Sequence, residues 1–362
     1  MTGFQHAVIN RVTINMLLNM PTIDCVNLFC SKSHYETLKI SDSRVVHFPV
    51  RVLKPGKYRI AKFFLESWQT FRVIRKSHDD LIYLLSCFPN VHYFLTKFSK
   101  VFKSKKVLIT VHGEAEGLVM PGKWKIWSYP FWITRTFKLK VDDNIHRVVL
   151  GESIYMNLRK LGLSQNVYYM EHPYEDFKNE NSVLPSCGKN IFAYVGNCIK
   201  RKGGLIFVDA ANKVDSAAFW VIGSYNVDSS YPANCSVLSD GQMLSYDKFN
   251  TALEQITYAC YPYAPGSYRF TASGAIFDAI KYLKPLIYIG NDYFDSIIGD
   301  LNVGYRCKDA HEFIDTIIRV NAESNENMYR TQIENLKQLQ RLFTPEVVSH
   351  KLFKIISSVL ES

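Results

Sequence analysis

The segment TASGAIFDAIKYLKPLI, residues 271 to 287, places one carboxylate inside an expected helix that small residues open. Ser273 and Gly274 let a ligand approach backbone N–H groups that lack a partner within the helix, so this end can bind an anion. Asp278 follows about five residues later, roughly 7.5 Å along the axis. That spacing suits a ribose hydroxyl beside a diphosphate. Alternatively, Thr271 or Ser273 only caps the helix and Asp278 is an ordinary polar residue.

A second candidate for phosphate binding lies in YVGNCIKRKGG, residues 194 to 204. The apolar run at residues 191 to 196 predicts a buried strand, and a basic, glycine-containing turn with Lys, Arg and Lys at residues 200 to 202 follows it. The turn at residues 271 to 274 also comes between an expected strand and a helix. Both turns therefore open on the same edge of a parallel sheet. A solvated basic turn is the alternative reading.

A third candidate site is acidic and lies in KVLITVHGEAEG, residues 106 to 117. A carboxylate at the tip of a parallel strand can accept a proton from a substrate hydroxyl, and Glu114 is the preferred base, with Glu116 as its rival. His112 would orient the base or contact a diphosphate. The alternatives are a solvated acidic loop beside a buried histidine, and metal ligation by the three side chains, which we disfavour.

Aromatic and basic residues alternate without any acid in PGKWKIWSYPFWITRTFKLK, residues 121 to 140. Such a mixture suits an anionic membrane interface, where Trp lies at headgroup depth and Lys and Arg meet phosphates. It can also bind single-stranded nucleic acid or form a packed loop. We predict an acceptor and membrane face formed by Lys123, Trp124, Lys125, Trp127, Trp132, Arg135 and Lys138.

The composition is that of a globular chain with a basic first half. The chain has 362 residues, 47% of them hydrophobic, and a formal net charge of +10. Up to Pro173 there are 25 Lys and Arg against 12 Asp and Glu, and the remainder has 18 against 21. No apolar run is long enough to span a bilayer, and the first residues lack the pattern of a signal peptide. The eight cysteines are scattered without metal-binding spacing, so we expect reduced thiols.

Expected strands and helices alternate in both halves, which predicts the α/β class with doubly wound parallel sheets. A polar stretch at residues 172 to 190 separates the halves. We therefore expect an N-terminal acceptor-binding domain at residues 1 to 173 and a C-terminal donor-binding domain at 174 to 345. We expect residues 346 to 362 to form a helix that crosses back to the first domain.

The second half resembles the C-terminal domain of GT-B glycosyltransferases, especially the family 4-like enzymes of bacterial capsule, O-antigen and exopolysaccharide synthesis. The resemblance spans roughly residues 190 to 310 and rests on YVGNCIKRKG and ASGAIFDAIKYLKPLI. It implies two Rossmann-like domains facing a cleft. The donor site that it implies comprises Gly196, Asn197, Arg201, Lys202, Gly203, Arg269, Ser273, Gly274 and Asp278.

The resemblance also implies roles for these residues. Lys202, with Arg201 as the alternate, would neutralise the donor diphosphate, and Asp278 would hold the ribose. The sequence departs from the family at Asn197, where many members have arginine. It departs again at Phe270, which replaces the first glutamate of a pattern typical of retaining members. Together with Glu114, this second departure favours an inverting mechanism.

The expected function is transfer of a sugar from a nucleotide-diphosphate donor, with UDP-sugar preferred, to a lipid-linked glycan in bacterial surface polysaccharide synthesis. We expect no cofactor, no metal and no nucleic-acid partner. The location would be cytoplasmic, peripheral on the inner face of the plasma membrane. The alternatives are a sugar-nucleotide epimerase of similar fold and a basic protein that binds single-stranded nucleic acid without catalysis.

Overall fold

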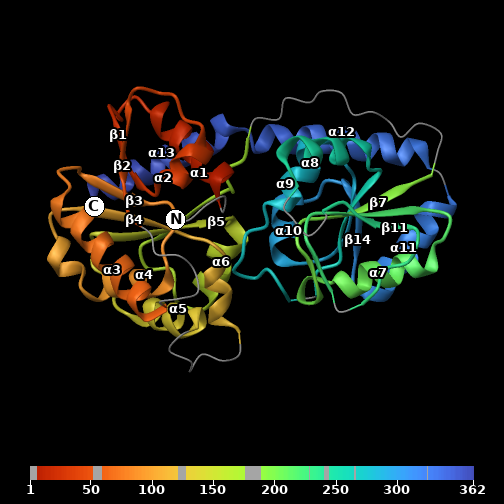
Figure 1. The fold of residues 1–362 in the computed structure, drawn as a ribbon, viewed down its shortest axis with the longest axis horizontal. Helices are drawn as coiled ribbons and strands as arrows, with labels where there is room; N and C mark the ends of the chain where they lie inside the picture. The colour runs from red at the N-terminus through yellow and green to blue at the C-terminus, as the bar shows by residue number, and fades with distance from the viewer. Residues whose placement is uncertain are drawn as a thin grey trace. The chain divides into compact units, whose positions relative to one another are not determined.

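A computed structural model of the 362-residue chain forms two compact α/β units. Unit 1 comprises Met1–Glu175, Arg269–Ala272 and Thr344–Ser362, and unit 2 comprises Asp176–Tyr268 and Ser273–Phe343. Figure 1 shows the parallel strands and surrounding helices of each unit. The structure describes residues 6–51, 59–120, 128–175, 189–227, 229–239, 244–264, 266–323 and 325–362, with only the backbone for residues 59 to 63.

Unit 1 alternates strands and helices, as its sequence pattern predicts. Its elements are α1 (Ala7–Leu18), β1 (Val26–Cys30), α2 (Lys32–Leu38), β2 (Val45–Pro49), α3 (Arg59–Lys76), β3 (Leu81–Leu84), α4 (Pro89–Lys97), η1 (Ser99–Phe102), β4 (Lys106–Val111), η2 (Gly113–Leu118), α5 (Tyr129–Lys138), β5 (Ile145–Leu150), α6 (Glu152–Lys160), β6 (Val167–Met170) and α13 (Pro345–Glu361).

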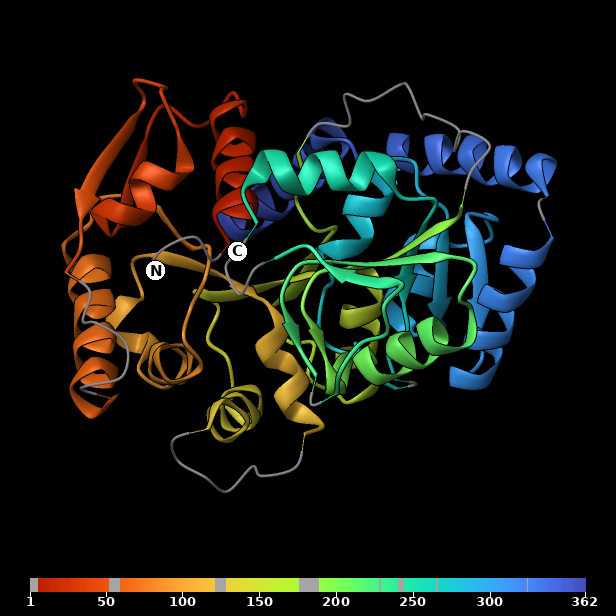
Figure 2. The same ribbon diagram turned by 45° about the vertical axis from the view of Figure 1, so that its right-hand side comes forward.

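The strands of unit 1 form two separate parallel sheets. One pairs β1 with β2, and the other has the order β3-β4-β5-β6. Figure 2 shows the β1–β2 pair as a ribbon of its own, in red and orange. The segment at residues 79 to 87, which fits either a helix or a strand from its sequence, contains strand β3 because it pairs along its length with β4.

Helix α13, although last in the chain, belongs to the core of unit 1. Its buried residues Val348, Leu352 and Ile356 lie in one apolar cluster with Ile9 and Met16 of α1. Its N-terminus is capped by Thr344, whose hydroxyl accepts a hydrogen bond from the N–H of Val347. Burial of this apolar face holds the terminal segment against α1.

Unit 2 is a single doubly wound sheet with the order β11-β9-β7-β12-β13-β14, parallel throughout. A short pair, β8 with β10, lies outside this sheet. The elements are β7 (Ile191–Val195), β8 (Cys198–Ile199), η3 (Lys200–Lys202), α7 (Gly204–Lys213), β9 (Ala218–Ile222), β10 (Tyr225–Asn226), β11 (Cys235–Val237), α8 (Tyr246–Gln255), β12 (Tyr258–Tyr261), α9 (Ala275–Lys281), β13 (Leu286–Ile289), α10 (Asp292–Ile298), β14 (Gly304–Cys307), α11 (Ala310–Ala322) and α12 (Glu326–Leu342).

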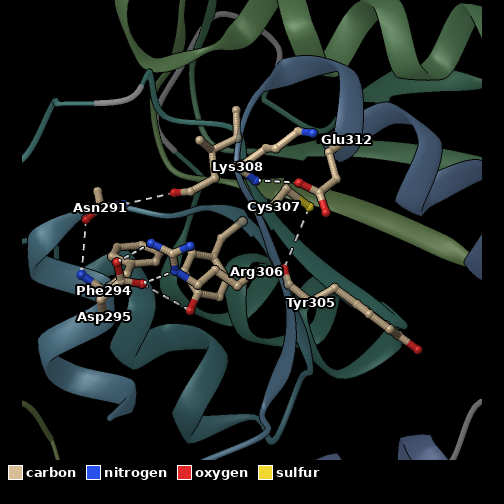
Figure 3. Close-up of polar contacts among 10 residues, drawn as sticks. Asn291, Phe294, Asp295, Tyr305, Arg306, Cys307, Lys308 and Glu312 are labelled. Atoms are coloured by element: carbon tan, nitrogen blue, oxygen red, sulfur yellow. Dashed lines mark hydrogen bonds and ion pairs between the residues drawn. The ribbon is translucent and has the colours of Figure 1, made fainter. Parts of the chain in front are cut away.

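Polar side chains fix the last strand of unit 2 to its neighbouring helix (Figure 3). The guanidinium of Arg306 on β14 donates to both carboxylate oxygens of Asp295 on α10, at 2.8 and 2.9 Å. Asn291 caps α10 by accepting a hydrogen bond from the N–H of Phe294 at 3.1 Å. The bidentate geometry sets the position of α10 at the edge of the sheet.

Among the described residues, no helix is long and apolar enough to cross a membrane.

Candidate functional site

Two loops of unit 2 meet at one edge of its sheet because the strands before them are neighbours. Strand β7 pairs in parallel with β12, so the turn after β7 and the loop after β12 both leave from the carboxyl edge. The hydroxyl of Tyr194, at the inner end of the first turn, donates to the carbonyl of Lys202 at 2.9 Å and to that of Asn197 at 3.3 Å. This buried phenol therefore holds the basic turn closed.

The basic turn presents one cation over an aromatic surface. The Lys202 ammonium lies 5.6 Å from the ring centroid of Tyr268 and 5.9 Å from that of Tyr263. The two tyrosine rings stack on each other at 4.5 Å. Lys202 is half-buried, whereas Arg201 is exposed. Of the two cations that the resemblance offers for a diphosphate, Lys202 therefore has the more defined position.

Gly203 allows the basic turn to approach the loop after β12. Its φ is 78°, in the left-handed region that favours glycine. A Cβ at this position would overlap the backbone carbonyl of Pro262. Only glycine satisfies both the backbone conformation and the lack of space. Lys202 therefore directly precedes a close contact between the backbones of Gly203 and Pro262.

The turn before α9 joins the same edge. Ser273 is buried and hydrogen-bonded to Tyr263, whose pKa burial raises well above its ordinary value. Gly274 is the N-cap residue and has no side chain with which to cap the helix. Asp278, half-buried on α9, lies near Tyr261, and its charge adds to the effect of burial in raising the pKa of that phenol. Ser273, Asp278 and Lys202 thus surround one tyrosine cluster.

The remaining residues predicted for the donor site are Gly196, Asn197 and Arg269. Gly196 has a φ of 108°, and Asn197 is exposed and accepts a hydrogen bond from the Ser224 hydroxyl at 2.8 Å. Arg269 belongs to unit 1, where its carbonyl accepts a hydrogen bond from Asn157 at 3.0 Å. Its guanidinium lies 5.7 Å from the ring centroid of Phe270.

The acidic candidates of unit 1 follow β4 in the short helix η2, and they differ in environment. Glu114 is half-buried, and its removal from water raises its pKa to about 7, although backbone hydrogen bonds at Glu114 and His112 oppose the shift. Glu116 accepts hydrogen bonds from the N–H of Phe270 at 2.8 Å and the hydroxyl of Thr271 at 3.0 Å. Glu116 therefore contributes to the packing of residues 270 and 271, whereas Glu114 has a pKa near neutrality and stays the predicted base.

His112 is a neutral histidine with a fixed orientation. Burial, followed by the charge of His6, lowers its pKa to about 3. Its Nε2 donates to the carbonyl of Leu85 at 2.8 Å, and its ring lies 4.4 Å from that of His6. His172 is a third neighbour, with a pKa lowered by burial to about 4. At neutral pH the cluster can donate or accept hydrogen bonds but carries no positive charge.

The structure describes part of the predicted membrane face. Trp132 is half-buried and packs against Tyr93 and Phe94 at 5.3 and 5.7 Å, so its ring contributes to the junction of α4 and α5. Arg135 covers the ring of Phe131 at 3.5 Å, and Lys138 is exposed. Four predicted residues lie outside the described ranges, namely Lys123, Trp124, Lys125 and Trp127.

Sequence reasoning missed the aromatic and histidine partners of the site. Tyr263 and Tyr268 lie in the loop YPYAPGSY after β12, where a cluster of tyrosines beside proline and glycine is the only signal. His6 and His172 are 166 positions apart in the sequence yet both act on His112. Such a cluster depends on sheet topology and leaves no local pattern.

Among the residues that the structure describes, no group of three or more His, Cys, Asp or Glu side chains could hold a metal ion. Metal independence stays a prediction.

Comparison with known proteins identifies the fold. No family model matches the chain, and no curated protein matches it. Among solved structures, sucrose-phosphate synthase from Thermosynechococcus elongatus matches with a TM-score of 0.67 and 13% identity, over 89% of this chain and 85% of that one. Anabaena HepE in complex with UDP matches with a TM-score of 0.65 and 10% identity, over 96% of both chains.

A third match is S. aureus TarM in complex with UDP and other ligands, with a TM-score of 0.55 and 12% identity. It covers 81% of this chain, which spans only 58% of the TarM chain. The predicted fold, α/β with Rossmann-like domains of the GT-B glycosyltransferase type, is confirmed by these likenesses. At such low identity they establish the fold alone.

We predict that Gly203→Ala destabilises the protein far more than Gly266→Ala. Both glycines have nearly the same φ, 78° and 79°, but a Cβ at Gly266 meets nothing within 4 Å. The left-handed backbone should lower the free energy of unfolding by about 1 kcal/mol in each variant. The overlap with Pro262 should add about 2 kcal/mol or more at Gly203. Denaturant unfolding measures both, and equal losses would contradict the proposed close approach.

We also predict a pH-dependent penalty from Glu114. Its pKa rises from 4.5 to about 7 on folding. Between these values the native state binds more protons than the unfolded state, so stability falls as pH rises. The loss should reach roughly 3 kcal/mol, at about 1.4 kcal/mol for each pH unit between the two pKa values. Glu114→Gln should remove this loss of stability. The free energy of unfolding of the variant should therefore rise relative to that of the wild type between about pH 4 and pH 8, as unfolding measured across that range will show. Glu346→Gln, on the exposed side of α13, is the control. A gap between wild type and Glu114→Gln that does not change with pH would refute the assigned environment.

Proposed function

We propose that the chain is a glycosyltransferase that uses a nucleotide-diphosphate sugar, and that unit 2 binds the donor. The observation that carries this proposal is the convergence of Lys202, Ser273 and Asp278 on one tyrosine cluster at the carboxyl edge of β7 and β12. A cation, a turn that begins a helix and a carboxylate suit a diphosphate and a ribose. UDP in the HepE and TarM structures supports a uridine nucleotide as the first donor to test.

In this proposal the reaction is an inverting displacement that needs no metal. The acceptor hydroxyl oxygen forms a bond to the anomeric carbon while the bond from that carbon to the diphosphate breaks, and the diphosphate leaves with the electron pair. Glu114 takes the proton of the hydroxyl, a role for which a carboxylate with a pKa of about 7 is suited. Lys202 stabilises the charge on the departing diphosphate.

The proposed acceptor is a glycan on a lipid carrier, in bacterial surface polysaccharide synthesis, which places the protein on the cytoplasmic face of the plasma membrane. The basic excess of the first half supports this location. So do exposed aromatic residues on α3: Phe64 and Trp68 are 63% and 55% exposed. Arg72 lies 5.2 Å from the Trp68 ring, so the surface pairs an aromatic with a cation.

We predict that UDP stabilises the wild type against thermal unfolding, by about 2.7 kcal/mol at a hundred times its Kd. Lys202→Ala and Asp278→Ala should each weaken UDP binding at least about tenfold, since each removes a charged contact. Lys213→Ala, an exposed lysine at the end of α7, should leave Kd unchanged. Glu114→Gln should retain UDP binding and lose sugar transfer.

Other outcomes would overturn the assignment. Equal UDP affinity in Lys202→Ala, Asp278→Ala and Lys213→Ala would remove the proposed donor site. Interconversion of nucleotide sugars without an acceptor would favour an epimerase. Stabilisation by a single-stranded oligonucleotide alone would favour nucleic-acid binding by the basic first half.

We predict that the protein cosediments with phosphatidylglycerol vesicles and much less with phosphatidylcholine vesicles, because the basic surface needs anionic headgroups. Trp68→Ala should lose most of this binding, since it removes the interfacial ring on α3. Tyr231→Ala, which removes an aromatic side chain of similar exposure in unit 2, is the matched control. Vesicle binding that is unaffected by Trp68→Ala would exclude α3 as the contact.

A further inference from the structure

The four residues Arg269–Ala272 belong to unit 1, although the chain on both sides of them belongs to unit 2. Phe270 is fully buried, and Ala272 packs against the apolar cluster that α1 and α13 share. The residues directly before and after this segment, Tyr268 and Ser273, are assigned to unit 2. Unit 1 therefore holds a short loop whose two ends lead into the other unit.

The short helix η2 holds this segment through hydrogen bonds. One carboxylate oxygen of Glu116 accepts from the N–H of Phe270 at 2.8 Å and from the hydroxyl of Thr271 at 3.0 Å. The same hydroxyl lies 3.4 Å from the carbonyl oxygen of Gly113. A Cβ at Gly113 would lie 3.1 Å from the methyl carbon of Thr271, so glycine at this position allows the close approach.

Helix α6 adds a further hydrogen bond to the same segment. The side-chain amide of Asn157, which is buried, donates to the carbonyl of Arg269 at 3.0 Å. Three successive residues, 269, 270 and 271, are therefore bound by side chains of unit 1. Glu116 binds two of the three, so it makes the larger contribution.

The two ends of the segment carry groups of the candidate donor site. Tyr268 stacks on Tyr263 at 4.5 Å, and the Lys202 ammonium lies 5.6 Å from the ring centroid of Tyr268. Ser273 is buried and hydrogen-bonded to the same Tyr263. Tyr268 has a φ of 59°, which a bulky residue adopts only where its surroundings hold it. The positions of both groups therefore depend on the backbone of residues 269 to 272.

We propose that Glu116 is a positioning residue of the donor site. By binding residues 270 and 271, its carboxylate keeps Tyr268 and Ser273 in the places where they surround the candidate diphosphate-binding cation. The inference rests on the proposed function, because the donor site is part of that proposal. It assigns Glu116 a role other than proton transfer.

This role requires a hydrogen-bond acceptor at residue 116 and not a negative charge. A single oxygen of Glu116 accepts both hydrogen bonds, and the amide oxygen of a glutamine can accept the same two. Alanine has no acceptor, so it would leave the N–H of Phe270 without this partner. The segment would then occupy its present arrangement for a smaller fraction of the time. A ligand that needs this arrangement binds more weakly by the same factor.

The test compares Glu116→Ala and Glu116→Gln in the full chain, with UDP as the probe. We expect Glu116→Ala to raise the Kd for UDP at least about tenfold, because hydrogen bonds to a charged group are lost. Glu116→Gln should bring the Kd back to within about threefold of the wild type, since neutral hydrogen bonds are weaker than charge-assisted ones. It should also retain sugar transfer, which substitution of a general base would abolish.

Amide hydrogen exchange of the free protein tests the same role without a nucleotide. The N–H groups of Ser267 and Phe277, on either side of the segment, make backbone hydrogen bonds of 3.0 Å. In Glu116→Ala, exchange should become at least about tenfold faster at these two amides and at Phe270, and Glu116→Gln should largely restore it. Faster exchange at Phe270 alone would overturn the proposal. An equal rise throughout both units would also overturn it, since the variant would then have lost stability in general.

The two measurements separate this inference from the proposed function. If the wild type does not bind UDP and exchange changes as expected, the donor assignment fails and the hold of Glu116 on its neighbours stands. If the wild type and Glu116→Ala bind UDP equally well, the positioning role fails and the donor assignment stands. Normal UDP affinity with loss of sugar transfer in Glu116→Gln would make Glu116 the base and overturn the positioning role.

Discussion

The contact between Gly203 and the carbonyl of Pro262 is the constraint on which the candidate donor-binding edge of unit 2 depends. It brings the turn after β7 against the loop after β12, and no side chain could occupy the space between them. The Tyr194 hydroxyl closes the turn from within by binding the carbonyl of Lys202. Because the backbone is fixed on both sides of Lys202, its ammonium lies over Tyr263 and Tyr268 instead of extending into solvent. The packed backbone thus sets where the Lys202 side chain starts, and the two tyrosine rings lie beside its ammonium.

In unit 1, burial shifts the pKa values of the candidate residues more than neighbouring charges do. The carboxylate of Glu114 and the imidazoles of His112 and His172 are withdrawn from water, so burial shifts the pKa of each towards its neutral form. Neutral histidines cannot hold Glu114 ionised by attraction, and its pKa of about 7 is consistent with their presence. Glu116 contrasts with it, since two donors from residues 270 and 271 bind its carboxylate. Two glutamates that are only two positions apart in the sequence therefore have different surroundings and different hydrogen-bond partners.

The sequence by itself determined the α/β class, most of the strands and helices, and the turn at residues 200 to 204, because hydrophobic periodicity and glycine are local signals. It also identified Glu114 from its place after a strand and Asp278 from its place on a helix, and the resemblance to GT-B glycosyltransferases added Lys202. Only the tertiary structure showed that Lys202 is more buried than Arg201, and that Glu116 accepts hydrogen bonds from residues 270 and 271 whereas burial raises the pKa of Glu114. It also showed that Trp132 packs against other aromatic rings, and that His6, His112 and His172 lie close together. These distinctions depend on burial and on contacts between residues far apart in the chain, and no pattern of neighbouring residues encodes them.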